Sequence, residues 1–268
     1  IINHVNPDEI YNLAAQSHVK ISFQIPEYTS DVNALGPLRL LEIIRHYKKK
    51  KIKFYQASSS EMFGKSKPPQ NENTRFQPRS VYAISKVFAY HSVIHYREAY
   101  NLHACNGILF NHESPRRGVN FVTKKIVQGL TRIKQGKQKN LILGNLYARR
   151  DWGHAKDYVE SMWKILQQKK PEDFVVATRT SHSVKDFINV CAKKLGIKLL
   201  WKNKGLKEVG INKVSNKIII RINKKYFRET EVDDLIGDFS KAKRILQWKP
   251  KYSFNKLVDD MIENEQYE

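Results

Sequence analysis

The stretch Lys53-Phe54-Tyr55-Gln56-Ala57-Ser58-Ser59-Ser60-Glu61 indicates the fold of this chain. Its first six residues, Lys53–Ser58, have the aromatic and small apolar side chains of a buried strand, and polar residues follow at once. A helix is predicted over Tyr82–Tyr100 and a second apolar strand over His103–Phe110. A strand, a helix and a strand in this order predict an α/β fold with a parallel sheet and crossover helices.

The same alternation continues on both sides of this unit. A short strand is predicted over Glu9–Leu13, and a helix from Glu27 to about Lys48, kinked at Pro37 because proline lacks the backbone N–H. We therefore predict a doubly wound parallel sheet within residues 1–149 and a smaller, mainly substrate-binding lobe within 150–268, partly interleaved with the first. Later helices are predicted over Phe121–Gln135, Asp157–Lys169, Val184–Leu195, Ser240–Leu246 and Phe254–Glu265, and later strands over Leu141–Leu143, Phe174–Ala177, Leu199–Trp201 and Ile218–Ile222.

Composition narrows the class of protein. The 268 residues are 41% hydrophobic, which suffices for a core, and 48 Lys and Arg against 26 Asp and Glu give a net charge of +22. Lysines dominate and spread along the chain, so we interpret them as a solvated surface and predict no nucleic-acid partner. No apolar run reaches membrane-spanning length. Cys105 and Cys191 form no CxxC pair, which predicts no disulfide, no metal site and a reducing, cytoplasmic compartment.

Polar residues that follow the predicted strands could carry out chemistry. Tyr82 and Lys86 are four residues apart at the start of a helix and share one face. A nearby ammonium is expected to lower the pKa of a phenol from about 10 and to make it a usable base. Ser59 offers a hydroxyl for the same substrate oxygen, and Glu61 offers a second group for proton transfer. Carboxyl ends of parallel strands meet at one edge, so we expect these four side chains in one cleft.

These residues also resemble a known family. Ser59, Tyr82 and Lys86 are similar to the Ser/Thr–Tyr–Lys triad of extended short-chain dehydrogenases/reductases, and longer strings resemble the GDP-mannose 4,6-dehydratase family within that group. The longest of these strings are Tyr11–Val19, Asn106–Gly118 with Asn-His-Glu-Ser-Pro-Arg-Arg-Gly, Arg150–Val159 with Arg-Asp-Trp-Gly-His-Ala-Lys-Asp-Tyr, and Tyr226-Phe227-Arg228. The family usually has Thr where Ser59 stands, and both residues offer a hydroxyl.

The resemblance implies a Rossmann-like fold, NADP as cofactor, GDP-mannose as substrate and a homo-oligomer in the full-length form. It implies that Tyr82, assisted by Lys86, takes the 4-OH proton, and that Glu61 removes the C5 proton and helps the 6-OH to leave as water. The residues that match cofactor positions are Leu13, Ala14, Ala15, Gln16, Ser17, Tyr28, Tyr82, Lys86, His112 and Arg117. Those that match GDP-sugar positions are Ser17, Glu61, Asn111, Lys125, Arg150, Arg228 and Glu231.

One family feature does not occur in this sequence. The family begins with a strand and a Gly-x-x-Gly-x-x-Gly turn that seats the cofactor pyrophosphate, whereas the first glycine here is Gly36. We therefore expect an N-terminally truncated form that binds NADP weakly and shows no turnover. Three alternatives stay open: a dehydratase for another nucleotide sugar, an epimerase, against which Glu61 argues, and an inactive fragment or basic non-catalytic module.

Overall fold

The computed structural model describes residues 1–265. Its first sheet has four parallel strands in the order β1-β2-β3-β7, with β1 at one edge. The predicted strands 53–58 and 103–110 pair directly as β2 and β3, so the parallel sheet is confirmed. The bounds are β1 Glu9–Asn12, β2 Lys53–Ser59, β3 Ala104–Leu109 and β7 Phe174–Val176.

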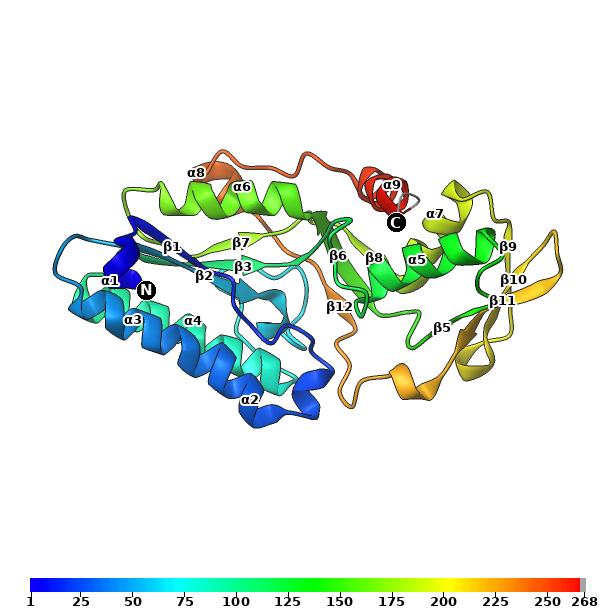
Figure 1. Cartoon of the computed structure of the whole chain (residues 1–268), viewed down its shortest axis with the longest axis horizontal. Helices are drawn as coiled ribbons and strands as arrows, with labels where there is room; N and C mark the ends of the chain where they lie inside the picture. The colour runs from blue at the N-terminus through cyan, green and yellow to red at the C-terminus, as the bar shows by residue number, and fades with distance from the viewer. Residues whose placement is uncertain (266–268) are drawn as a thin grey trace.

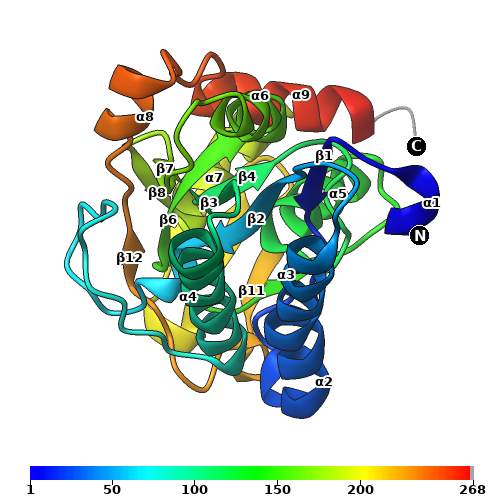
Figure 2. The same cartoon turned by 90° about the vertical axis from the view of Figure 1, so that its left-hand side faces the viewer.

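Helices cover both faces of this sheet, as in a doubly wound fold. Helices α3 (Gly36–His46) and α4 (Val81–Tyr100) lie side by side on one face, and α6 (Ala155–Leu166) and α8 (Ser240–Ile245) lie on the other (Figures 1 and 2). The core on the α6 side contains the fully buried Tyr55, Tyr158 and Trp248. The predicted α/β fold is thus confirmed.

The helix predicted from Glu27 to Lys48 is interrupted. It begins as α2 (Pro26–Ser30), continues as a π-helical turn over Asp31–Leu35, and ends as α3 at His46. The Gly36 N–H donates to the carbonyl of Asp31, five residues back. Pro37 cannot donate a helical hydrogen bond, and the irregular turn lies directly before it.

A second lobe is built on a mixed sheet in the order β5-β11-β10-β9. Three helices pack together on it, and their apolar side chains form the largest buried cluster. Strand β10 was not predicted, and it pairs antiparallel with both of its neighbours. The bounds are β5 Leu141–Leu143, β11 Lys217–Ile222, β10 Val209–Asn212 and β9 Leu199–Lys202 for the strands, and α5 Val122–Lys134, α7 Val184–Lys194 and α9 Phe254–Glu265 for the helices.

A third, short sheet lies between the two lobes (Figure 1). Its order is β12-β6-β4, and β8 pairs antiparallel with β6. The buried Asp151 carboxylate of β6 accepts backbone N–H groups of Thr178 at 2.8 Å, Arg179 at 2.8 Å and Gly237 at 3.3 Å, and so ties three segments together. The bounds are β12 Asp234–Leu235, β6 Arg149–His154, β4 Asn111–Glu113 and β8 Ser181–Ser183.

The chain passes between the lobes several times. After α5 and β5 it returns to the first sheet through α6 and β7, and after the second sheet it returns again as α8. The remaining short elements are α1 Ile2–Val5, η1 Ile21–Phe23, η3 Ser60–Met62, η4 Gly205–Lys207 and η5 Lys224–Tyr226. No helix within residues 1–265 has the length and apolar character needed to cross a membrane.

Candidate active site

A cavity of about 470 Å³ opens where the carboxyl ends of β1, β2 and β3 meet the second lobe. This volume lies in the range of small-molecule sites. Most of the predicted site residues line the cavity, whichever part of the chain they come from. They are Leu13, Ala15, Ser17, Ser59, Glu61, Tyr82, Lys86, Asn111, His112, Arg117, Lys125, Arg150, Arg228 and Glu231.

Three predicted cofactor residues do not line this cavity. Ala14 is exposed, and Tyr28 is 60% exposed on α2. The Gln16 side chain is engaged elsewhere, donating to the His18 carbonyl at 3.1 Å and accepting from the Thr29 hydroxyl at 3.3 Å. Cofactor contacts of these three residues stay predictions.

The end of β2 aims Glu61 into the cavity. Ser59 is the last residue of the strand, and its hydroxyl oxygen accepts the Glu61 backbone N–H at 3.2 Å, capping the 3₁₀ turn η3. A capping hydroxyl fixes the first turn after a strand. The same turn therefore places the Ser59 hydroxyl and the Glu61 carboxylate together on the cavity wall.

The first two turns of α4 supply the other two predicted catalytic residues. Ser80 caps this helix by accepting the Ala83 N–H at 3.1 Å. The Lys86 ammonium donates to the Ala57 carbonyl of β2 at 2.9 Å and lies 5.9 Å from the centroid of the Tyr82 ring. Both side chains are buried. A strand end and a helix start thus bring all four predicted catalytic residues to one cavity.

The pKa values in this group differ from the sequence expectation. Burial raises the pKa of Tyr82, and Glu61 raises it further, whereas a hydrogen bond with Ser59 and the charge of Arg117 lower it. Burial also lowers the pKa of Lys86 to about 8. The expected lowering of the Tyr82 pKa by Lys86 is therefore wrong for this structure, because burial outweighs the neighbouring charges. The Tyr82 hydroxyl is protonated at neutral pH.

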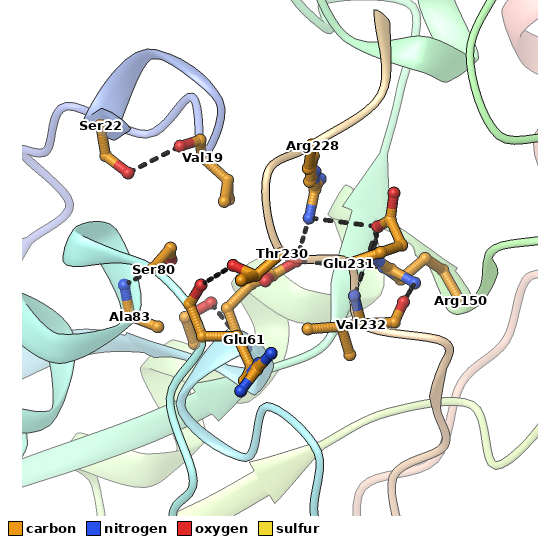
Figure 3. A network of polar contacts seen from close by, with 12 residues as sticks. Val19, Ser22, Glu61, Ser80, Ala83, Arg150, Arg228, Thr230, Glu231 and Val232 are labelled. Atoms are coloured by element: carbon orange, nitrogen blue, oxygen red, sulfur yellow. Dashed lines mark hydrogen bonds and ion pairs between the residues drawn. The ribbon is translucent and has the colours of Figure 1, made fainter. Parts of the chain in front are cut away.

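Four charged side chains, those of Glu61, Arg150, Arg228 and Glu231, form a compact cluster in the cavity wall (Figure 3). Arg228 Nη1 lies 3.3 Å from Glu61 Oε1, and Arg150 Nε lies 3.9 Å from the same oxygen. Glu231 Oε1 lies 3.4 Å from Arg150 Nη2 and 3.9 Å from Arg228 Nη1. Two positive charges thus face two negative charges, which is the arrangement that makes buried charges tolerable.

The two arginines of this cluster are held differently. Arg150 comes from β6 and also donates to the Val232 carbonyl at 2.7 Å. Burial is the largest influence on its pKa and lowers it. Burial also lowers the pKa of Arg228, but the carboxylates of Glu61 and Glu231 outweigh that effect and raise it. Both guanidinium groups stay charged at neutral pH, because arginine titrates above pH 12.

Residues of β4 form the part of the wall next to Tyr82. The His112 ring nitrogen Nδ1 lies 2.9 Å from the Phe110 carbonyl, and the ring stacks on Tyr158 with centroids 4.6 Å apart. Burial lowers the pKa of His112 to about 4, so the ring is neutral at pH 7. The buried Asn111 Oδ1 atom has no hydrogen-bond partner within residues 1–265, which leaves an acceptor for a ligand.

The cavity lining also includes Gly144 and Tyr226, which the sequence analysis did not assign. Lys125 Nζ lies 3.8 Å from the centroid of the Tyr226 ring, a cation–π contact. A Cβ atom added at Gly144 would lie 2.5 Å from the Tyr226 carbonyl oxygen, so only glycine permits this close approach. Tyr226 belongs to the quoted string Tyr226-Phe227-Arg228, which was the available signal for it.

Comparisons with known proteins agree with this geometry. The family described as "GDP-mannose 4,6 dehydratase" matches residues 1–261. The "GDP-mannose 4,6 dehydratase" of Dictyostelium discoideum is 54% identical over 264 residues, which cover 98% of this chain and 74% of that protein.

Two solved structures share the fold. RMD from Pseudomonas aeruginosa, complexed with NADPH, gives a TM-score of 0.82 at 20% identity and covers 98% of this chain and 82% of that one. The dTDP-glucose 4,6-dehydratase of Bacillus anthracis str. Ames, in complex with NAD, gives a TM-score of 0.78 at 22% identity over 99% of this chain and 75% of that one. By its sequence match over nearly the whole length, the chain belongs to the GDP-mannose 4,6-dehydratase family.

Proposed function

We propose that this chain is a hydro-lyase that converts GDP-mannose into GDP-4-keto-6-deoxymannose and water. The observation that carries the proposal is the convergence of Tyr82 and Glu61 on one cavity, in a chain of this family. Oxidation at C4 needs a group that takes a hydroxyl proton. Elimination across C5 and C6 needs a second group, and a carboxylate suits it. An epimerase has no use for that carboxylate.

A nicotinamide dinucleotide is the cofactor that the cavity fits, and we propose NADP. The two structural neighbours were solved with NADPH and with NAD. The cavity of this chain is lined by the Asn111 Oδ1 acceptor, which has no partner within residues 1–265, by the Lys86 ammonium and by the charged Arg117. These groups suit the amide, the ribose and the phosphate of a dinucleotide. When bound, the dinucleotide supplies a reversible acceptor for the hydride of C4. The weak NADP binding expected from the missing glycine-rich turn stays a prediction, and a titration with NADP measures it.

The chain's own residues move the protons. Tyr82 first releases its own proton to solvent, because its hydroxyl is protonated at neutral pH, and the Lys86 ammonium beside it stabilises the phenolate that forms. The phenolate then takes the proton of the 4-OH as C4 becomes a ketone. The ketone acidifies the C5 hydrogen. Glu61 takes that proton and passes one to the departing 6-OH, so that one water leaves. A hydride at C6 and a proton at C5 complete the 6-deoxy product, and the atoms balance as substrate minus water.

The diphosphate of the substrate needs cations, and the cavity is lined by Lys125, Arg150 and Arg228. Two of these cations already face Glu61 and Glu231. We propose that Lys125 provides the additional positive charge that a diphosphate requires.

We also propose a cytoplasmic location and a dimer or tetramer. Both cysteines are buried and free, which suits a reducing compartment. Ile84 and Phe88 lie 56% and 44% exposed, one turn apart on α4, and such apolar side chains commonly meet a second subunit.

The test compares a form of the protein that carries the family's N-terminal glycine-rich segment with its Glu61→Gln variant, in GDP-mannose and excess NADP. We expect that form to release product lighter by one water in the mass spectrum, whereas the 268-residue chain alone is expected to show no turnover. Glu61→Gln should stop dehydration while C4 oxidation still generates reduced nicotinamide, detected by its ultraviolet absorbance. Glu72→Gln changes a half-buried carboxylate outside the cavity, which accepts the Val175 N–H at 2.7 Å, and should leave turnover intact. Normal dehydration by Glu61→Gln would contradict the assignment.

A further inference from the structure

Glu113 is a buried carboxylate in the cavity wall to which the proposed mechanism gives no role. It is the last residue of β4 and is 2% exposed. Its Oε2 atom accepts the Thr123 hydroxyl at 2.7 Å and lies 3.0 Å from Arg117 Nε. An isolated buried carboxylate is unfavourable, so such a residue needs partners of this kind. Its position is therefore tied to that of Arg117.

Arg117 is held on a second side by an aromatic ring. Its guanidinium carbon lies 3.7 Å from the centroid of Phe121, whose other neighbour is the His18 ring at 5.5 Å. Burial lowers the pKa of His18, so the His18 ring is neutral at neutral pH. Arg117 is then the one charged group in the stack of Arg117, Phe121 and His18. A guanidinium fixed by a carboxylate and by a ring face retains little rotational freedom.

The N–H donors of the Arg117 guanidinium are not all used by Glu113 and Phe121. A guanidinium carries five N–H donors, and the Nε edge faces Glu113. Within residues 1–265 no hydrogen bond runs from either Nη atom of Arg117, and its buried Nε atom meets Glu113 as an ion pair without hydrogen-bond geometry, although the side chain is only 25% exposed. The four Nη donors are therefore available to an anionic or carbonyl group that enters the cavity.

Electrostatics support the pairing. Burial raises the pKa of Glu113, and the charge of Arg117 and the Thr123 hydrogen bond both lower it. Burial is the largest of these influences and raises the pKa overall, so Arg117 and Thr123 offset only part of the cost of burying the Glu113 charge. Both contacts of the carboxylate, with Arg117 and with the Thr123 hydroxyl, are made by its Oε2 atom.

We infer that Glu113 is a positioning residue that holds the Arg117 guanidinium against Phe121, so that its Nη groups bind an oxygen of the nicotinamide dinucleotide. The inference rests on the proposed function for the cofactor. Glu113 itself does not touch the ligand, and its whole effect on binding passes through Arg117.

A double-mutant cycle on NADPH binding tests this inference, using cofactor fluorescence over a range that extends to millimolar. The variants are Glu113→Gln, Arg117→Gln and the double variant. We expect Arg117→Gln to weaken binding by about tenfold or more and Glu113→Gln by about fivefold, as for loss of charge-assisted hydrogen bonds. The double variant should bind no more weakly than Arg117→Gln alone. Glu72→Gln, the same change in a half-buried carboxylate outside the cavity, should leave binding unchanged.

Each outcome is decisive. Losses that add in the double variant, or normal binding by Glu113→Gln, would show that Glu113 does not act through Arg117. Failure of the unmodified protein to bind NADPH would instead overturn the proposed cofactor and, with it, the ligand named here. The positioning itself is then judged separately by NMR. The Arg117 Nε–H resonance should be protected from solvent exchange in the unmodified protein and lost in Glu113→Gln, and equal exchange in both would refute it.

Discussion

The two walls of the cavity differ in how far apart in the sequence their contacting residues lie. On the first-sheet wall, contacts within a few residues set the geometry: Ser59 caps the turn that carries Glu61, and Ser80 caps the helix that carries Tyr82. On the second wall, Arg228 reaches Glu61 across 167 residues of sequence and Arg150 reaches Glu231 across 81. The first wall depends on local backbone structure, whereas the second depends on the folded arrangement of distant segments.

This difference separates catalysis from stability. A side chain on the first wall can change chemically without moving the elements that carry it. A charge removed from the second wall leaves another charge buried without its partner, and the fold itself loses stability. Substitutions on the two walls should therefore have different thermodynamic signatures, and three experiments test this.

The largest effect is expected for Tyr82→Phe. The ring stays buried and only the hydroxyl is lost, so kcat should fall about a thousandfold or more, as for loss of a general acid–base group, with the melting temperature nearly unchanged. Steady-state dehydration of GDP-mannose measures it, in a form of the protein that carries the family's N-terminal glycine-rich segment. Tyr100→Phe, at the exposed end of the same helix, serves as the control. A variant that loses stability rather than kcat would remove the distinction between the walls.

The second effect is expected for Arg150→Met. This change leaves Glu61 and Glu231 with one cation between them and removes the donor to the Val232 carbonyl, so unfolding should become easier by about 3 kcal/mol. Urea denaturation measures the difference. The neighbouring Arg149, whose side chain is 44% exposed, provides the control, and Arg149→Met should cost less than about 1 kcal/mol. Equal losses of unfolding free energy at Arg150 and Arg149 would mean that the buried cluster stabilises the fold no more than an exposed arginine does.

The smallest effect concerns pH and Lys86. Its pKa falls from 10.5 to about 8 on folding because of burial, so the cost of burying its charge is fully present below pH 8 and disappears as the pH rises toward 10.5. Lys86→Met should therefore stabilise the fold by about 2 kcal/mol at pH 7, which is the pKa effect less the lost hydrogen bond, and by clearly less at pH 10.

Paired denaturation curves at the two pH values measure this change. The exposed Lys134 gives the matched control, since Lys134→Met should show no such dependence on pH. A stabilisation by Lys86→Met that grows toward pH 10 would give the opposite sign and would refute the burial argument.

The sequence predicted the first sheet because its strands are short apolar runs with clear breaks. It did not predict β4, β6 and β8, which are rich in Asn, His, Arg, Asp and Ser, and whose pairing depends on segments brought together by the fold. Strand propensity gives little signal for such polar edges. The irregular π-helical turn before Pro37 was likewise expected only as a kink.

Much of the candidate site was also accessible from sequence. The strand-end and helix-start positions placed Ser59, Glu61, Tyr82 and Lys86 in one cleft, and they line one cavity, although their roles stay predictions. The direction of the Tyr82 pKa shift could not be obtained this way, because it depends on the depth of burial and not on the spacing to Lys86. No sequence pattern near Glu61 or near Arg228 indicates that these two residues pair.

The repeated passage of the chain between the lobes has a consequence for biosynthesis. Trp248 completes the core that contains Tyr55 and Tyr158, and its indole N–H donates to the Asp157 carbonyl at 2.8 Å. On the ribosome, β2 and β3 emerge well before residue 248, so the core on the α6 side of the nascent sheet stays incomplete until Trp248 has been translated. Such late closure favours slow folding and capture by chaperones during translation. A stalled or prematurely terminated nascent chain would present that open apolar face to the cell.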